Sequence, residues 1–240
     1  MLIAADASQL EWRTAVQLSG DVVGLEEIQN KLDTHSLNKQ AFQLPTRLIS
    51  KRYLFRTIFR GSGWAFANDN DFSHVSSSAS YWDGINEKFY SKYKGLDSWH
   101  HDLAKIVSSG EVIHGPLGRS WSINMARDRF GNLKLPWTIF TNYPVQGTGA
   151  DVMTIVRVSF YKKIKQKGIP CSFITTVHDS IVVDAESKYL DVIAETFYEA
   201  FAEAISNIKK LFGYTWRVPL ECEVKYGPNM GEMKKYLTNK

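Results

Sequence analysis

The chain begins MLIAADASQLEWR (residues 1–13), and this stretch decides the first part of the fold. The apolar run Leu2–Ala5 predicts a short strand that ends at Asp6. Ser8 stands three residues before Glu11, a spacing typical of a capping box that opens a helix. We therefore expect a strand, an acidic turn and a helix in succession.

A second acidic turn lies toward the other end of the chain. Residues 169–177 and 181–183 are two β-rich runs, and the tripeptide 178–180 separates them. Two such runs around a tight turn predict a hairpin with Asp179 at its tip. Adjacent strands of one sheet would bring Asp179 close to Asp6.

A basic helical face lies between these two turns. Residues 47–60 contain no Gly or Pro, and Gly61-Ser62-Gly63 ends the predicted helix. Arg47, Lys51 and Phe55 recur at every fourth position, which places two cations and one ring along one face of that helix.

The remaining pattern is mainly helical. Further helices are expected over 81–93, 97–107, 143–166 and 189–211, with a turn-rich hairpin over 111–125 and a last strand over 220–226. Gly95 would separate two of the helices, and Pro144 would lie in the first turn of another. The order of elements predicts an α+β fold, in which a block of helices is inserted into a sheet-based domain.

Aromatic residues are frequent between Trp64 and Trp99, among polar neighbours. Such rings either pack the helices of a small satellite core or form exposed surfaces on which bases stack. General habits of aromatic side chains favour the core.

Composition limits the class of protein. The chain has 240 residues, 44% of them hydrophobic, and 29 Lys and Arg against 25 acidic residues. This mild positive charge permits a basic face for nucleic acid. The two cysteines lie far apart without Cys-x-x-Cys company, which argues against zinc and a disulfide framework. No run of about 18 apolar residues predicts a membrane span, so we expect no membrane partner and a cytoplasmic location.

Four motifs resemble those of family A DNA polymerases, the bacterial polymerase I group. Residues 6–13, DASQLEWR, resemble the first catalytic motif, and 176–179, TVHD, resemble the third. Arg47-x3-Lys51-x3-Phe55 is similar to the nucleotide-binding fingers helix, and residues 142–151 to the start of a long palm helix. Their order agrees as well.

The resemblance implies a polymerase palm, an antiparallel sheet with helices, that carries an inserted helical fingers subdomain. It divides the chain into a first part of the palm over 1–35, fingers over 36–136 and a second part of the palm over 137–240. It also implies a cytoplasmic enzyme, in the host cytoplasm if phage-encoded.

Nucleotide addition needs charge compensation at the attacking 3′-hydroxyl and at the leaving pyrophosphate, which two magnesium ions supply. The resemblance implies that Asp6, Asp179 and the backbone carbonyl of Ala7 hold both ions. By local pattern alone, Asp6 reads as a helix N-terminal acid and Asp179 as a solvated turn acid.

The resemblance also assigns residues to the other ligands. The dNTP-binding set is Gln9, Glu11, His35, Arg47, Lys51 and Phe55, with Phe59 stacking on the template base and Arg119, Asn142, Gln146 and His178 contacting primer–template DNA. Glu11 would exclude a 2′-hydroxyl, which favours dNTP over rNTP. By local pattern, the basic set is a solvated helix face, and Asn142 and Gln146 are helix caps.

The chain departs from the family pattern at several positions. Relatives have Gly where Arg56 and Arg60 stand, commonly Glu at Ser180, and Trp at Met230. They also carry a thumb, a first palm strand and usually an exonuclease domain before the first motif. We therefore expect either a product of a split polymerase gene, as in some phages, or a truncated form that needs a second polypeptide with thumb, remaining palm and, where present, exonuclease.

Three functions compete at this point. The first is the catalytic subunit of a template-directed DNA polymerase. The second is a non-catalytic DNA-binding or scaffold subunit that retains the fold, which Arg56, Arg60 and Ser180 motivate. A single-subunit RNA polymerase is the third, and Glu11 disfavours it.

Overall fold

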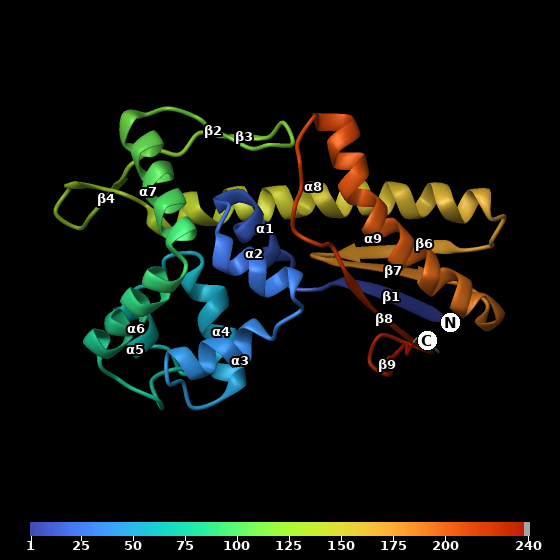
Figure 1. The fold of residues 1–240 in the computed structure, drawn as a ribbon, viewed down its shortest axis with the longest axis horizontal. Helices are drawn as coiled ribbons and strands as arrows, with labels where there is room; N and C mark the ends of the chain where they lie inside the picture. The colour runs from blue at the N-terminus through green and yellow to red at the C-terminus, as the bar shows by residue number, and fades with distance from the viewer. Residues whose placement is uncertain (238–240) are drawn as a thin grey trace. The chain divides into compact units, whose positions relative to one another are not determined.

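The computed structural model describes residues 1–237. The chain divides into two compact units (Figure 1). We call residues 1–10 together with 148–240 the sheet unit and residues 11–147 the helical unit. The mixture of helices and an antiparallel sheet confirms the predicted α+β class. The division into palm and fingers remains a prediction, because it separates the chain by function and not by compactness.

The sheet unit contains a five-stranded antiparallel sheet in the order β6-β7-β1-β8-β9. Its strands are β1 Leu2–Ala7, β6 Ser172–Val177, β7 Ser180–Asp184, β8 Cys222–Gly227 and β9 Lys234–Lys235. The central strand is β1, where Ala5 lies opposite Ile181 on one side and Val224 on the other. The predicted first strand, acid-tipped hairpin and last strand are all present.

Two helices and one short 3-10 turn complete this unit. These are η1 Ser187–Tyr189, α9 Leu190–Phe212 and the C-terminal part of α8, which runs over Trp137–Gln166. The ring of Phe160 in α8 stacks on that of Phe197 in α9, with centroids 3.8 Å apart, and its edge contacts Phe173 of β6. These rings join both helices to the sheet.

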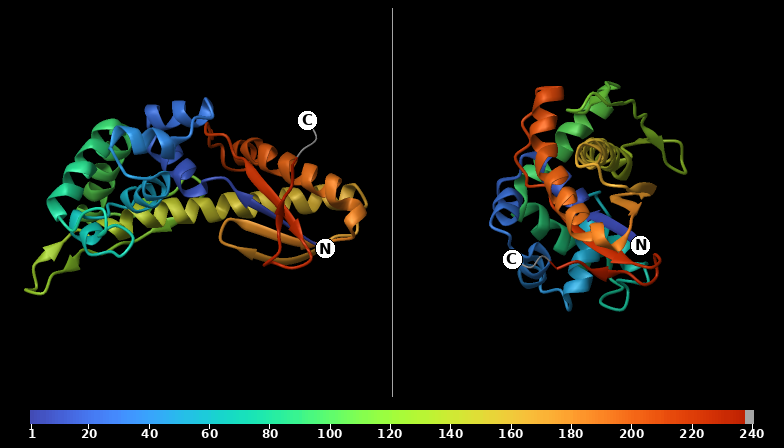
Figure 2. Two further views of the ribbon diagram at one scale, coloured as in Figure 1. Left: turned by 90° about the horizontal axis from the view of Figure 1, so that it is seen from below. Right: turned by 90° about the vertical axis from the view of Figure 1, so that its right-hand side faces the viewer.

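Within its described residues, the helical unit contains six complete helices, α1 except for its first residue, and two small hairpins. The helices are α1 Leu10–Ser19, α2 Val22–Gln29, α3 Thr34–Ala41, α4 Arg47–Thr57, α5 Gly63–Ala67, α6 Ala79–Lys92 and α7 Lys94–Ser109. The hairpins are β2 Ile113–His114 with β3 Ser120–Trp121, and β4 Ala126–Arg127 with β5 Leu133–Lys134. Two further views show how these elements are arranged (Figure 2).

The aromatic residues of this unit form a core. Tyr53 lies within ring-contact distance of Phe66, Trp82 and Phe89, and Phe72 packs edge-on against Trp82. All five side chains are fully buried. The core interpretation therefore holds for these rings, and base stacking by them is excluded.

Two local expectations were wrong, and one hairpin was missed. Helix α8 begins at Trp137, directly after Pro136, so Pro144 lies inside the helix and not in its first turn. Proline has no N–H, so Pro144 cannot donate to the carbonyl of Phe140. Gly95 lies inside α7, and the break between helices falls at Tyr93. The β4–β5 hairpin was not predicted, because two-residue strands show no alternation.

Neither long helix provides a membrane span. Among residues 1–237, every helix is too short or too polar to cross a bilayer.

Candidate functional site

The two predicted catalytic carboxylates lie on neighbouring segments of the sheet unit. Asp6 is paired in register with Ser180, the residue that follows Asp179. The backbone N–H of Ala7 donates to the carbonyl of Asp179 at 2.9 Å. The antiparallel sheet thus brings together residues from opposite ends of the sequence.

We call the end of β1 at Asp6, together with the neighbouring turn at Asp179, the acidic edge of the sheet. Residues with a strained backbone lie next to both of these aspartates. His178 is the first residue of a two-residue hairpin turn and has φ 51°. Tight hairpin turns with a positive φ at that position normally use glycine. Gln9, just after β1, has φ 52°. Non-glycine residues in the left-handed region cost free energy and cluster at functional sites, which supports a role for this edge.

The chemistry of the edge suits a hard divalent cation. Magnesium prefers carboxylate oxygens and keeps several water or phosphate ligands, so one or two protein carboxylates suffice. Burial, followed by the negative charges of Asp6 and Glu221, raises the pKa of the Cys222 thiol to about 12. Within residues 1–237, no group of three or more His, Cys, Asp or Glu side chains is arranged as a metal site. The donors present at this place are the carboxylates of Asp6 and Asp179, which are of the type that magnesium prefers.

In the helical unit, the start of α4 carries the predicted triphosphate-binding residues. The Thr46 hydroxyl caps this helix by accepting from the N–H of Ile49 at 3.1 Å. Arg47 forms a two-point ion pair with Asp33, the N-cap residue of α3. Lys51, one turn along, lies 6.0 Å from the centroid of the Phe55 ring.

The same cluster includes His35. Its ring centroid lies 6.2 Å from that of Phe55, and its side chain is only 2% exposed. Burial, with Arg47 and Lys51 adding to it against the opposing charge of Asp33, lowers the pKa of His35 to about 4. Its Nδ1 has no hydrogen-bond partner among the described residues. The neutral imidazole of His35 therefore has a nitrogen without a hydrogen-bond partner, and it lies near the cations Arg47 and Lys51.

A third group joins residues that were predicted for different ligands. Gln146 Nε2 donates to Glu11 Oε1 at 3.3 Å. A Cβ atom on Gly147 would lie 2.6 Å from the Trp121 ring and 3.5 Å from Cδ of Arg119. A larger residue at 147 would therefore displace the Trp121 ring, and Arg119 lies beside Gly147, the residue that follows Gln146.

The other predicted DNA-binding residues are placed as follows. Asn142 lies on α8, four residues before Gln146, and is half-buried. Phe59 follows the end of α4 and is also half-buried, with its N–H donating to the carbonyl of Arg56. His178 lies in the hairpin turn of the sheet unit.

Comparison with known proteins identifies the family. The sequence model described as DNA polymerase family A matches residues 1–232. The chain belongs to DNA polymerase family A. It is 28% identical to DNA polymerase I of Aquifex aeolicus over 232 residues, covering 92% of this chain and 38% of that protein. It is 25% identical to DNA polymerase I of Caldicellulosiruptor bescii, covering 98% of this chain and 27% of that one.

A solved structure shows the same fold. The POL domain of Pol1 from M. smegmatis, in complex with DNA primer-template and dNTP, matches with a TM-score of 0.76 and 22% identity. The match covers 94% of this chain and 39% of that chain. The chain therefore spans less than two fifths of the length of each of these three proteins.

Two departures from the family pattern have a structural explanation. Arg56 pairs with Asp69 at 2.7 Å and lies over the ring of Phe72. Arg60, with φ 60°, pairs with Asp97. Each of these two cations therefore has an acidic partner within the helical unit.

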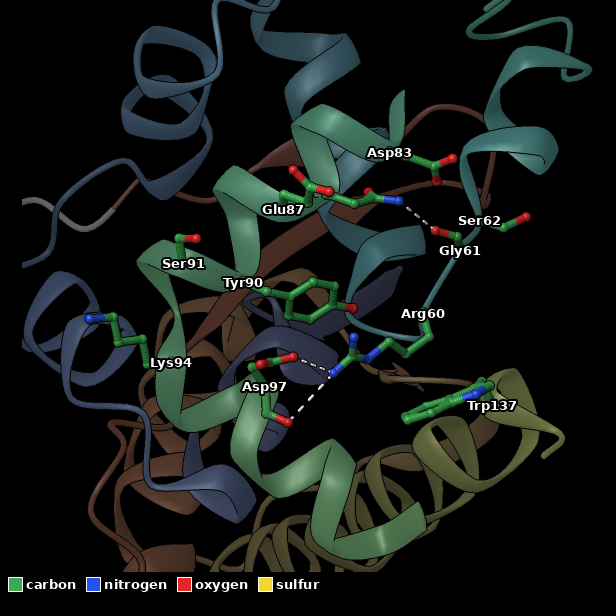
Figure 3. A pocket seen from close by; sticks show the side chains of 11 residues that line it. Arg60, Gly61, Ser62, Asp83, Glu87, Tyr90, Ser91, Lys94, Asp97 and Trp137 are labelled. Carbon is green, nitrogen blue, oxygen red and sulfur yellow. Dashed lines mark hydrogen bonds and ion pairs between the residues drawn. The ribbon is translucent and has the colours of Figure 1, made fainter. Parts of the chain in front are cut away.

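Arg60 lies at a pocket of about 800 Å³ in the helical unit (Figure 3). Its guanidinium lies 3.9 Å from the Tyr90 ring centroid and 5.0 Å from that of Trp137, and Nε donates to Nδ1 of His100 at 3.0 Å. The side chain thus connects the end of α4 to α6, α7 and the start of α8. We assign Arg60 a structural role.

Proposed function

We propose that this chain is the catalytic part of a template-directed DNA polymerase, which adds a dNTP to a primer 3′-hydroxyl by two-metal nucleotidyl transfer. The observation that carries this proposal is the placement of Asp6 beside the Asp179 turn in a family A fold. The strained backbone at Gln9 and His178 supports it.

The carboxylates of Asp6 and Asp179 and the carbonyl of Ala7 would hold two magnesium ions. When bound, the ions would neutralise charge on the attacking and leaving oxygens of an in-line displacement. Two carboxylates at one sheet edge repel each other without cations, so the edge favours cation binding.

The cluster on α3 and α4 would contact the nucleotide. Arg47 offers a planar fork to phosphate and Lys51 a point charge, while Phe55 stacks on sugar or base. His35, neutral at pH 7, would donate one hydrogen bond to a phosphate. The Asp33 carboxylate holds Arg47 in the ligand-free chain, so phosphate must share or replace that partner.

Glu11 and Gln9 would border the sugar, and Phe59 would stack on the template base. Because Gln146 holds Glu11 through a hydrogen bond, the carboxylate leaves little room for a 2′-hydroxyl. Arg119, Asn142, Gln146 and His178 would contact the minor groove, where every base pair offers acceptors.

We further propose that activity requires the parts that longer relatives carry, namely thumb and remaining palm. A second polypeptide, with an exonuclease where one is present, is the proposed source, and phage origin and a cytoplasmic location remain predictions. The mild positive charge of the chain suits primer–template DNA as the other partner.

The experiment compares Asp6→Ala, Asp179→Ala and the matched control Asp184→Ala. Asp184 lies in the same sheet, where its carboxylate pairs with the N-terminal ammonium group of Met1. Assembled with the polypeptide that co-purifies with it, the wild-type chain and the control should extend a primer with dNTP and Mg²⁺, while both test variants lose extension. Manganese binding, measured by electron paramagnetic resonance, should weaken in parallel.

The alternative, a non-catalytic DNA-binding or scaffold subunit, rests on Ser180 replacing the usual acid. It would be favoured if the assembled wild-type chain bound primer–template DNA but never extended it. Extension that survives in both Asp6→Ala and Asp179→Ala would overturn the assignment of the carboxylates.

A further inference from the structure

The β4–β5 hairpin is a small arm that no part of the proposed mechanism uses. It comprises residues 126–134, ARDRFGNLK, and connects the β2–β3 hairpin to α8. Figure 2 shows it projecting beyond the helices of the helical unit. A projecting ribbon exposes both of its faces, so its side chains contact either solvent or a ligand.

The tip of the arm is held by its own hydrogen bonds. The carboxylate of Asp128 accepts from the N–H groups of Phe130 at 2.8 Å and Asn132 at 2.9 Å. Gly131 has φ 85° and donates its N–H to the carbonyl of Asp128 at 3.0 Å. The N–H of Asp128 donates to the carbonyl of Asn132 at 2.9 Å, which leaves a three-residue loop over 129–131. A loop of this length that ends in a left-handed glycine is a common hairpin turn. These hydrogen bonds therefore define the backbone of the turn around residue 130.

That residue is an exposed phenylalanine. The Phe130 side chain is 73% exposed and Leu133 60% exposed. The guanidinium of Arg129 lies 4.7 Å from the Phe130 ring centroid, and Arg127 Nη1 donates to the carbonyl of Gly131 at 2.7 Å. A well-defined turn that holds an aromatic ring in water, instead of in a core, indicates a ligand with a flat apolar face.

The charge of the arm points to the same ligand. Residues 126–134 carry three cations, Arg127, Arg129 and Lys134, against one acid, Asp128. The carboxylate of Asp128 is already engaged within the turn. The exposed surface is therefore cationic around a ring, which is the combination that tracks phosphates and stacks bases in single-stranded nucleic acid.

We infer that the β4–β5 arm is a binding site for single-stranded DNA, with a base stacked on Phe130 and phosphates contacting Arg129 and Lys134. A single strand fits better than a duplex, because bases in a duplex are stacked on each other and offer no free face. A protein partner fits less well, since Phe130 and Leu133 alone make a small apolar patch. In a polymerase, this single strand would be the unpaired part of the template. That assignment rests on the proposed function.

The test measures fluorescence anisotropy of a labelled oligothymidylate of about 16 nucleotides with the full chain. Phe130→Ala should weaken binding roughly 5- to 100-fold, and Phe130→Trp should restore it. Phe212→Ala, which truncates another exposed phenylalanine, is the matched control and should bind as wild type does. Unchanged melting temperatures would show that the variants fold.

The charged residues are tested by salt dependence. In Arg129→Gln/Lys134→Gln, the slope of log affinity against log salt should decrease by about 1.4, because each phosphate contact to a single strand contributes about 0.7. Lys105→Gln, another exposed lysine, should leave the slope unchanged. Equal binding by wild type and Phe130→Ala would overturn the inference. So would Phe130→Ala weakening the binding of a blunt duplex as much as it weakens the binding of oligothymidylate.

The result is separable from the proposed function. Asp6→Ala should bind the single strand normally while losing extension. If Phe130→Ala binds normally and Asp6→Ala loses extension, only the arm inference fails. If Asp6→Ala and Asp179→Ala both retain extension while Phe130→Ala binds weakly, only the catalytic assignment fails.

Discussion

Asp33 and Arg47 form a two-point ion pair that joins the N-termini of α3 and α4. Nε of Arg47 lies 2.6 Å from Oδ2 of Asp33, and Nη2 lies 3.0 Å from Oδ1. Asp33 also accepts from the N–H of His35 as the cap of α3. One carboxylate thus positions a residue on each of two helices in the proposed nucleotide-binding cluster.

Asp33→Asn should reduce stability only slightly. The hydrogen bond from Arg47 holds the pKa of Asp33 well below its ordinary value, but both side chains are exposed to water, which screens the pair. Asparagine can still cap α3, so the free energy of unfolding in urea should fall by less than about 1 kcal/mol. Asp71→Asn, which breaks the similar Arg52 pair, is the control. A loss several times larger would show that the pair is effectively buried.

Stability should depend on pH through His35. Because its folded pKa is about 4 and its ordinary value 6.5, the unfolded chain binds a proton in that interval that the folded chain does not. Stability from this group is therefore complete above pH 6.5 and declines as pH falls toward 4. In urea denaturation, His35→Gln should show a smaller loss between pH 7 and pH 5 than wild type.

The exposed His74 provides the control for this prediction. His74→Gln should retain the wild-type pH dependence. An unchanged dependence in His35→Gln would mean that other buried groups dominate, such as His100, whose pKa burial also lowers.

Asp21 joins two helices and should be strongly stabilising. Its side chain is 1% exposed, and it accepts from Gly24 at 2.8 Å, from Gly95 at 2.8 Å and from Leu96 at 3.2 Å. Asp21→Ala would leave these N–H groups unpaired, which should cost about 2 to 4 kcal/mol of unfolding free energy. Denaturant titration measures this loss, and Asp71→Ala should lose far less. Equal losses would refute the bridging role.

Phe160 should contribute most to the core of the sheet unit. Its ring is fully buried and stacks on Phe197 with planes 5° apart. Phe160→Ala should lower the free energy of unfolding by about 3 to 5 kcal/mol through the cavity it leaves. Tyr161→Ala, at the half-exposed neighbouring position, should cost much less. Similar losses for both would mean that the helix and not the stack determines stability.

Much of the fold could be predicted because its signals are local. The apolar run before Asp6, the hairpin around Asp179 and the basic face of α4 each depend on residues that are neighbours in sequence. Alternation and helical periodicity are properties of such short stretches. The family resemblance added what local pattern could not, because both acids look like ordinary cap or turn residues.

Other features had no local signal. The β4–β5 strands are too short to alternate, and the start of α8 depends on how residues 137–143 pack. The Gln146–Glu11 hydrogen bond and the contact of Asp21 with Gly95 join distant parts of the sequence. Such pairs form only when distant segments of the chain pack together, so the sequence near either residue does not indicate them.

The sequence by itself determined the types of the longer elements that it predicted, the acidic turns, the basic helical face and the family. Only the tertiary structure decided that Ser180 lies opposite Asp6, that Asp33 holds Arg47, that His35 is buried and that Phe130 stands in water. The physical reason is that a residue's secondary structure depends on its neighbours in the chain, whereas its partners, burial and pKa depend on which distant segments pack against it.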